Sequence, residues 1–226
     1  MKTLVLTICS PEYAPLGDVT LPHWQAYCDR HGYEFRRSGV PAEGAAWGKL
    51  YLIMRALFEE NFDRVLWVGT DTLPTNPEYS LDYWMERYNF PDALIAADIA
   101  GLQSDVMIFN RTNVIQEYLY AAAVFGQRLH SNHGFAEQEA LSYFAYRLPY
   151  LGHIKIIPQK DWTGSGFLPG FQCYINEIHG RPREFSGRWA PGDWILHLPH
   201  TVIDLRIAIF RQFLETGDVD LGNLRV

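Results

Sequence analysis

The chain has 226 residues, a formal net charge of −7 and 48% hydrophobic residues, which excludes a disordered chain and predicts a single domain over residues 1–226. The acidic balance argues against a protein that grips a nucleic-acid backbone by bulk charge. Three widely spaced cysteines exclude a zinc ribbon or a dense disulfide framework and favour a reducing compartment. The apolar start is too short for a signal peptide, and no stretch approaches the roughly 18 apolar residues of a membrane span. We therefore expect a cytoplasmic protein.

Short apolar runs alternate with helical periodicity along the chain. Strands are predicted at 3–9, 33–37, 64–68, 93–99, 105–109, 154–158 and 194–198, and helices at 19–31, 45–60, 113–125, 135–147 and 202–214. This alternation predicts an α/β fold whose central sheet is mostly parallel and flanked by helices on both faces. Residues 159–193 lack periodicity and are rich in glycine, proline and aromatic residues, which is typical of a functional loop.

An acidic residue follows the strand predicted at 64–68, in Gly69-Thr70-Asp71. Ligands of open α/β sheets bind at the carboxyl ends of the strands, so Asp71 is placed to hold a divalent cation that in turn holds a diphosphate. The alternative is an aspartate that caps the following turn. Near the C-terminus, His197 and His200 follow another apolar strand. One imidazole and one carboxylate make an incomplete metal site, and the alternative is a histidine of the core.

Motifs of several other α/β enzymes are absent from the sequence. It has no G-x-G-x-x-G after its first strand, no Walker sequence, no G-x-S-x-G and no H-E-x-x-H. A dinucleotide-binding fold of the usual kind and a zinc protease are therefore not supported.

Six segments resemble, in order, the galactosyl- and xylosyl-transferase family of GT-A-fold glycosyltransferases, which includes fungal α-mannan galactosyltransferases and plant xyloglucan xylosyltransferases. They are LPHWQAYCDRHGYEF (21–35), WGKLYLIMRAL (47–57), DRVLWVGTDTLPTN (63–76), SDVMIFNRT (104–112), AEQEAL (136–141) and GDWILHLPH (192–200). Each motif is short, and their colinear order over roughly residues 3–200 carries the resemblance.

The resemblance implies a GT-A fold and transfer of a sugar, with retention, from a nucleoside-diphosphate donor, commonly UDP-linked, to an acceptor hydroxyl. It also implies Mn²⁺ or Mg²⁺, held by a D-x-D motif and a C-terminal histidine, and these match Asp71 and His197. Lys49 matches a basic residue that faces the nucleotide-sugar. The other donor-side candidates are Thr7, Ser104 and His200.

The same resemblance implies the catalytic candidates. Glu137 and Gln138 match a polar pair near the anomeric carbon, where either would stabilise an oxocarbenium-like transition state. Asp105 replaces a small residue and is expected to touch the donor sugar. The alternatives are a charged first helical turn favoured by the helix dipole for Glu137, and a strand-end cap for Asp105.

Three departures from the family pattern bear on the metal. Gly69 stands where the family has the first aspartate of D-x-D, and His200 stands where it has a glycine three residues after the terminal histidine. Val202 stands where some members have a lysine for the diphosphate. Three interpretations remain: Asp71 and His197 suffice with diphosphate and water; His200 or Arg206 supplies the missing positive charge; or the site has decayed to a nucleotide-sugar-binding module. A nucleotidyltransferase-like enzyme is a further alternative.

The acceptor is the least defined part. Trp162 and Trp189 are expected to line an acceptor groove, because aromatic faces suit sugar rings. A polysaccharide, a glycolipid head group, a protein and a modified nucleobase all remain open as acceptors. A chain without an anchor suits a bacterial or viral cytoplasmic enzyme.

Overall fold

The computed structural model describes residues 1–226 except 99–100, 131–135, 159–162, 166–188, 200 and 220–226. The strands are β1 (Thr3–Ile8), β2 (Glu34–Ser38), β3 (Arg64–Val68), β4 (Thr72–Pro74), β5 (Ala93–Asp98), β6 (Gly101–Asn110), β7 (Ile154–Pro158), β8 (Thr163–Ser165) and β9 (Ile195–His197). The α-helices are α1 (Ala14–His31), α2 (Gly44–Met54), α3 (Leu81–Arg87), α4 (Asn113–Tyr120), α5 (Gln127–His130), α6 (Ala136–Ala145) and α8 (Ile203–Thr216). A 3₁₀ turn, η1 (Pro11–Tyr13), precedes α1, and two π-helical turns, η2 (Arg55–Glu59) and η3 (Ala121–Gly126), extend α2 and α4.

The main sheet has six strands in the order β2-β1-β3-β6-β5-β7. All of its strands run parallel except β6, which is antiparallel to both β3 and β5. Every residue of β1 and β3 is buried, as their continuous apolar runs predicted. The predicted α/β fold with a mostly parallel central sheet is therefore confirmed.

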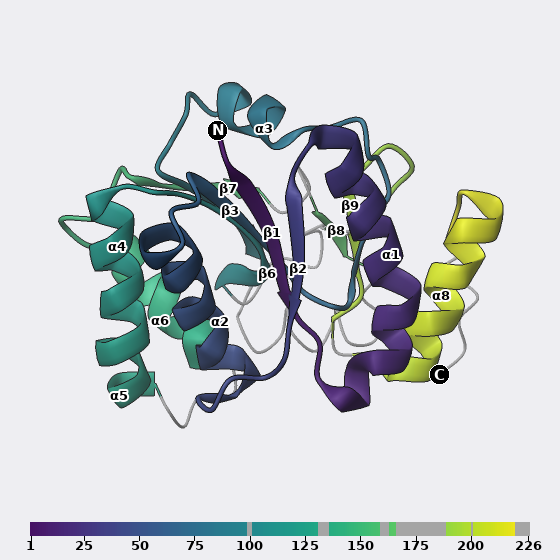
Figure 1. The fold of residues 1–226 in the computed structure, drawn as a ribbon, viewed down its shortest axis with the longest axis horizontal. Helices are drawn as coiled ribbons and strands as arrows, with labels where there is room; N and C mark the ends of the chain where they lie inside the picture. The colour runs from purple at the N-terminus through teal and green to yellow at the C-terminus, as the bar shows by residue number, and fades with distance from the viewer. Residues whose placement is uncertain (99–100, 131–135, 159–162, 166–188, 200, 220–226) are drawn as a thin grey trace, which may run out of the picture.

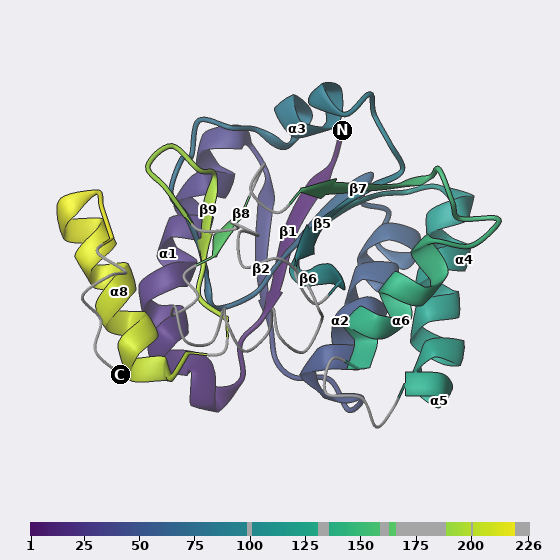
Figure 2. The ribbon, with the colours of Figure 1, turned by 180° about the vertical axis from the view of Figure 1, so that it is seen from behind.

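Helices cover both faces of this sheet (Figures 1 and 2). Helices α2, α4 and α6 lie together on one face, where Leu50, Ile53 and Leu119 join a large buried cluster. Helix α1 lies on the other face and contributes Trp24 and Tyr27 to a second cluster. Helix α8 packs along the outer side of α1. No helix among the described residues is long and apolar enough to cross a membrane.

A second, three-stranded sheet in the order β4-β9-β8 lies beside the main one. Strand β4 pairs antiparallel with β9, and Thr72 lies opposite His197. This pairing brings the C-terminal segment against the loop that follows β3. The sequence did not predict β4, because a three-residue strand carries no periodicity. Most of the predicted irregular region at 159–193 lies outside the described residues.

Several element boundaries differ from the prediction. Helix α1 begins five residues before the predicted start at 19, with a proline in its first turn, and it ends at Gly32, whose φ is +70°, as predicted. The predicted helices at 45–60 and 113–125 each change from α to π geometry near their ends. Helix α3 was not predicted; it is seven residues long, and its cap is Ser80, whose hydroxyl accepts a hydrogen bond from the Tyr83 N–H.

Candidate functional site

A cavity of about 370 Å³ opens where the carboxyl ends of β1 and β3 meet the first turns of α2. Its lining includes Ile8 at the end of β1 and Ser10 just after it, Gly69 and Asp71 after β3, Lys49 of α2 and Asp105 of β6. This is the edge at which ligands bind in open α/β sheets. Asp71 lines this cavity, and its role toward a ligand stays a prediction.

The loop that carries Asp71 is fixed by hydrogen bonds on both sides. The Thr70 hydroxyl donates to the Ile8 carbonyl at 2.7 Å, and the Thr20 hydroxyl of α1 donates to the Thr70 carbonyl at 2.8 Å. The Leu198 N–H donates to the Asp71 carbonyl at 3.0 Å, which ties the loop to the end of β9. The backbone of Asp71 is thus held in place before any ligand binds.

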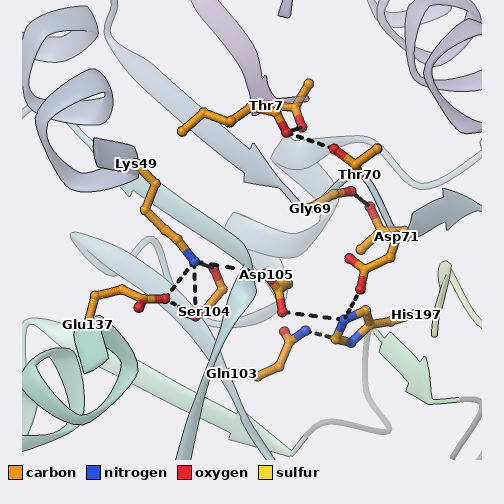
Figure 3. Close-up of polar contacts among 12 residues, drawn as sticks. Thr7, Lys49, Gly69, Thr70, Asp71, Gln103, Ser104, Asp105, Glu137 and His197 are labelled. Atoms are coloured by element: carbon orange, nitrogen blue, oxygen red, sulfur yellow. Dashed lines mark hydrogen bonds and ion pairs between the residues drawn. The ribbon is translucent and has the colours of Figure 1, made fainter. Parts of the chain in front are cut away.

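Asp71, Asp105 and His197 converge at one point (Figure 3). His197 Nε2 lies 3.7 Å from Asp71 Oδ2 and 3.4 Å from Asp105 Oδ2, and one ligand atom from each residue lies within 4.8 Å of the others. His197 is 2% exposed, and its Nε2 has no hydrogen-bond partner among the described residues. Two carboxylates and an unpartnered imidazole nitrogen are a donor set that suits a divalent cation.

Gln103 of β6 holds the imidazole from its other side. The Gln103 Nε2 lies 2.8 Å from His197 Nδ1, while the amide oxygen of Gln103 has no partner among the described residues. A half-turn of this amide lets its oxygen accept from Nδ1–H, which fixes the tautomer and leaves the Nε2 lone pair facing the carboxylates. Metal-ligating histidines are commonly held in this way.

Without a cation, the three groups form a charged cluster. Burial alone lowers the pKa of His197, but the neighbouring carboxylates of Asp71 and Asp105 outweigh it and raise that pKa to about 10. Desolvation acts to raise the pKa of Asp105, and His197, Lys49 and Arg206 together hold it well below its usual range. A bound cation would therefore replace the proton on His197.

Gly69 makes room for the Asp105 carboxylate. A Cβ at position 69 would lie 2.8 Å from Asp71 Oδ1, 3.2 Å from Asp105 Cβ and 3.3 Å from Asp105 Oδ1. The Gly69 N–H also donates to the Asp105 carbonyl at 2.7 Å. The sequence predicted Asp105 as a sugar contact and did not place it with Asp71 and His197, because strand pairing between β3 and β6 is not visible in the chain.

Lys49, Ser104 and Glu137 form a buried group that adjoins the first, because Lys49 Nζ also lies 3.9 Å from Asp105 Oδ1 (Figure 3). Lys49 Nζ lies 2.7 Å from Glu137 Oε1, 3.2 Å from Ser104 Oγ and 3.3 Å from the Ser104 carbonyl oxygen. The Ser104 hydroxyl also donates to Glu137 at 2.8 Å. Burial lowers the pKa of Lys49, but Glu137 and Asp105 outweigh it and raise that pKa. Gln138 is also buried, and its Nε2 has no partner among the described residues.

Among the predicted site residues, Lys49, Asp71 and Asp105 line the cavity. The others that the structure describes do not: Thr7, Ser104, Glu137, Gln138, Trp189 and His197. Thr7 is fully buried within β1, and its hydroxyl lies 3.5 Å from the Ile8 carbonyl oxygen. Trp189 is 6% exposed; it donates to Thr75 Oγ1 at 3.1 Å and packs edge-on against Phe213 of α8. Residues His200 and Trp162 lie outside the described part of the chain.

The chain matches no protein-family model and no curated protein sequence. Its structure is similar to a glycosyltransferase involved in the glycosylation of the major capsid of PBCV-1, with a TM-score of 0.71 at 12% identity, covering 94% of this chain and 100% of that chain. The chain has the GT-A fold. The galactosyltransferase LgtC, crystallised with donor and acceptor sugar analogues, aligns with a TM-score of 0.57 at 10% identity, covering 99% of this chain and 96% of that chain. GlyE of Streptococcus pneumoniae TIGR4 aligns with a TM-score of 0.55 at 11% identity, covering 100% of this chain and 66% of that chain.

Proposed function

We propose that this GT-A chain is a glycosyltransferase that moves a sugar from a nucleoside-diphosphate donor, with UDP-sugars as the first candidates, to an acceptor hydroxyl with retention. The observation that carries the proposal is the convergence of Asp71, Asp105 and His197 beside a cavity at the carboxyl edge of the sheet. The similarity to three glycosyltransferase structures supports the same conclusion. The acceptor is a carbohydrate or another hydroxyl-bearing molecule.

Mn²⁺ or Mg²⁺ fits the donor set of Asp71, Asp105 and His197, because the imidazole nitrogen that faces the two carboxylates is buried and forms no hydrogen bond within the described part of the chain. When bound, such a cation supplies positive charge that stabilises the departing diphosphate. The chain contributes the orientation of these ligands, since Gln103 holds the imidazole and Gly69 leaves the space that both carboxylates need.

The contacts of Glu137 and Gln138 separate their roles. The Glu137 carboxylate is committed to Lys49 and Ser104, so we assign it to positioning. Gln138 follows it on α6, and none of the described residues bonds its amide nitrogen. As the resemblance implies, we assign its amide oxygen to the stabilisation of the oxocarbenium-like anomeric carbon. The remaining donor-side and acceptor-side predictions for Thr7, Ser104 and residues 162 and 200 stay proposals.

The reaction then balances without a further reactant. The bond between the anomeric carbon and the diphosphate oxygen breaks, and its electron pair stays on that oxygen. The acceptor hydroxyl oxygen bonds to the anomeric carbon on the same face, and its proton passes to the departing phosphate oxygen. Configuration is retained because both events share one face.

The test is a donor screen followed by product analysis. UDP-, GDP-, dTDP- and CMP-sugars are screened by thermal shift with and without Mn²⁺, and the donors that raise the melting temperature are then incubated with the protein. We expect release of the nucleoside phosphate, and a loss of about 100-fold or more in Asp71→Asn, because it removes a charge that faces the departing group. Asp92→Asn is the matched control, since Asp92 pairs with His153 at 2.6 Å outside the cleft lining.

The other outcomes would contradict the proposed function, and two of them would indicate a different function. Release of pyrophosphate would identify a nucleotidyltransferase. Binding of a donor without turnover, with or without candidate acceptors, would identify a nucleotide-sugar-binding module. A screen in which no donor raises the melting temperature would refute the proposed function.

A further inference from the structure

A second hollow of about 420 Å³ adjoins the first, between the start of α1 and the start of α8. Its lining includes Tyr13, Asp71, Asp105, Thr201 and Arg206. Asp71 and Asp105 line both cavities, so the carboxylate pair stands where the two hollows meet. A ligand that fills the first cavity and reaches past these carboxylates would enter the second.

Arg206 is buried in the wall of this second hollow with hydrogen-bonding capacity to spare. It is 5% exposed, and its nearest charged contact is a long one, with NH1 3.4 Å from Asp71 Oδ2. Its Nε has no hydrogen-bond partner among the described residues. Because an unsatisfied buried donor on a charged group is costly, a guanidinium in this state favours a ligand with acceptor oxygens.

Lys49, the other buried cation near the carboxylates, is in a different state. An ammonium group has three protons, and Lys49 has three close acceptors in Glu137 Oε1 and the two Ser104 oxygens. These contacts join α2 to β6 and α6 inside the protein. Each proton of Lys49 therefore has an acceptor, whereas Arg206 Nε–H has none in the described part of the chain.

The start of α8 places a helix N-terminus at the edge of the second hollow. Arg206 lies in the first turns of a 14-residue helix, and Thr201 and Val202 at its beginning also line the hollow. The N-terminus of a helix carries partial positive charge and free N–H groups, which favour phosphate oxygens. The Arg206 guanidinium and the backbone at the edge of the hollow thus favour the same class of ligand.

Given the proposed function, we propose that Arg206, and not Lys49, binds the diphosphate of the nucleotide donor. Nε–H and one terminal N–H of the guanidinium form a fork that matches two phosphate oxygens. The nucleoside then occupies the first cavity, and the diphosphate passes the Asp71–Asp105 pair into the second. Arg206 stabilises the charge that builds on the departing phosphate.

The experiment compares ligands with and without phosphate on wild type, Arg206→Gln, Arg206→Lys and Arg211→Gln. Arg211 is the matched control, because it lies on the same helix and is exposed. UDP, GDP and dTDP are titrated calorimetrically with Mn²⁺ present, and the nucleoside of the one that binds is titrated by ligand-observed NMR. Binding of Mn²⁺ alone is followed by electron paramagnetic resonance.

We expect Arg206→Gln to weaken the affinity for the nucleoside diphosphate by about 10- to 100-fold, because charged hydrogen bonds to the phosphate oxygens are lost. The affinity for the nucleoside should stay within about two-fold of wild type. Arg206→Lys keeps the positive charge but not the two-pronged hydrogen-bonding geometry, so its loss of diphosphate affinity should be intermediate. It serves as the test variant if Arg206→Gln does not fold. Arg211→Gln binds like wild type.

Three results would overturn the inference while leaving the proposed function intact. The first is a diphosphate affinity equal to wild type in both Arg206 variants. The second is a loss of nucleoside affinity as large as the loss of diphosphate affinity. The third is an equally large loss of affinity for Mn²⁺ alone, which would mean that Arg206 acts only through Asp71. A wild-type protein that binds none of the three diphosphates would instead refute the proposed function itself.

Discussion

Gly69→Ala isolates the packing of the two carboxylates, because it adds one methyl group between them and removes no charge. The new Cβ would lie 2.8 Å from Asp71 Oδ1 and 3.2 Å from Asp105 Cβ, closer than nearly all real Cβ contacts. The φ of Gly69 lies outside the left-handed region, so alanine brings steric contact without backbone strain.

The magnitude follows from which atoms are able to move. The Asp71 carboxylate is the end of a side chain and can rotate away, whereas Asp105 Cβ is held next to the backbone of β6. Overpacking costs about 1–3 kcal/mol, and the reduced freedom of the unfolded chain returns about 0.4–1 kcal/mol. We expect a net loss near 1 kcal/mol, or about 2–4 °C in the melting temperature. Displacing the Asp71 carboxylate from the donor set should weaken the affinity for Mn²⁺ by about 10-fold or more, because the loss of even a supporting contact of a metal ligand has an effect of that size.

Mn²⁺ binding is measured by electron paramagnetic resonance and stability by thermal unfolding with EDTA. The matched control is Gly39→Ala, because a Cβ there meets nothing within 4 Å and its φ also lies outside the left-handed region. Mn²⁺ affinity equal to wild type in Gly69→Ala would refute the idea that this glycine reserves space for the two carboxylates. A loss of equal size in Gly39→Ala would refute it as well.

Two further predictions concern the charged groups of the site. In metal-free protein the pKa of His197 is raised from 6.5 to about 10. Protonated His197 therefore stabilises the fold fully below pH 6.5, and this contribution is lost as the pH rises toward 10. Melting temperatures measured with EDTA should fall over that interval, and the fall should be smaller in His197→Gln. An unchanged slope in the variant would contradict the assignment of the charge to His197. Lys49→Met leaves Glu137 buried without its cation and should cost about 3–5 kcal/mol in urea unfolding, and the double variant with Glu137→Gln should recover part of it. A double variant no more stable than Lys49→Met would show that the pair is not coupled.

Local sequence patterns predicted the elements whose physics is local. The apolar runs at 3–9 and 64–68 are buried strands, and Gly32 ends α1 in the left-handed conformation. The carboxylate of Asp71 could be placed at the edge of the sheet because it directly follows such a strand. The short elements β4 and α3 were not predicted, because three or seven residues are too few to show a hydrophobic periodicity.

Aromatic residues in the loop-like region show the same limit. Trp189 was expected beside an acceptor, yet it lies among buried residues against Phe213. A tryptophan face that can stack on a sugar ring packs equally well against another side chain. Whether the ring is buried depends on which helix packs against it, and the residues next to the tryptophan in the sequence do not determine that.

The sequence by itself determined the α/β alternation, the continuous burial of β1 and β3, and the positions of Asp71 and His197 at strand ends. The tertiary structure alone decided that Asp105 joins them and that Ser104 and Glu137 accept the protons of Lys49. It also decided that Arg206 Nε has no hydrogen-bond partner among the residues that the structure describes. The pairing of β6 with β3 and the pairing of β4 with β9 are contacts between segments more than 30 residues apart. Because a strand has the same local pattern whichever neighbour it pairs with, only the folded chain decides which side chains meet.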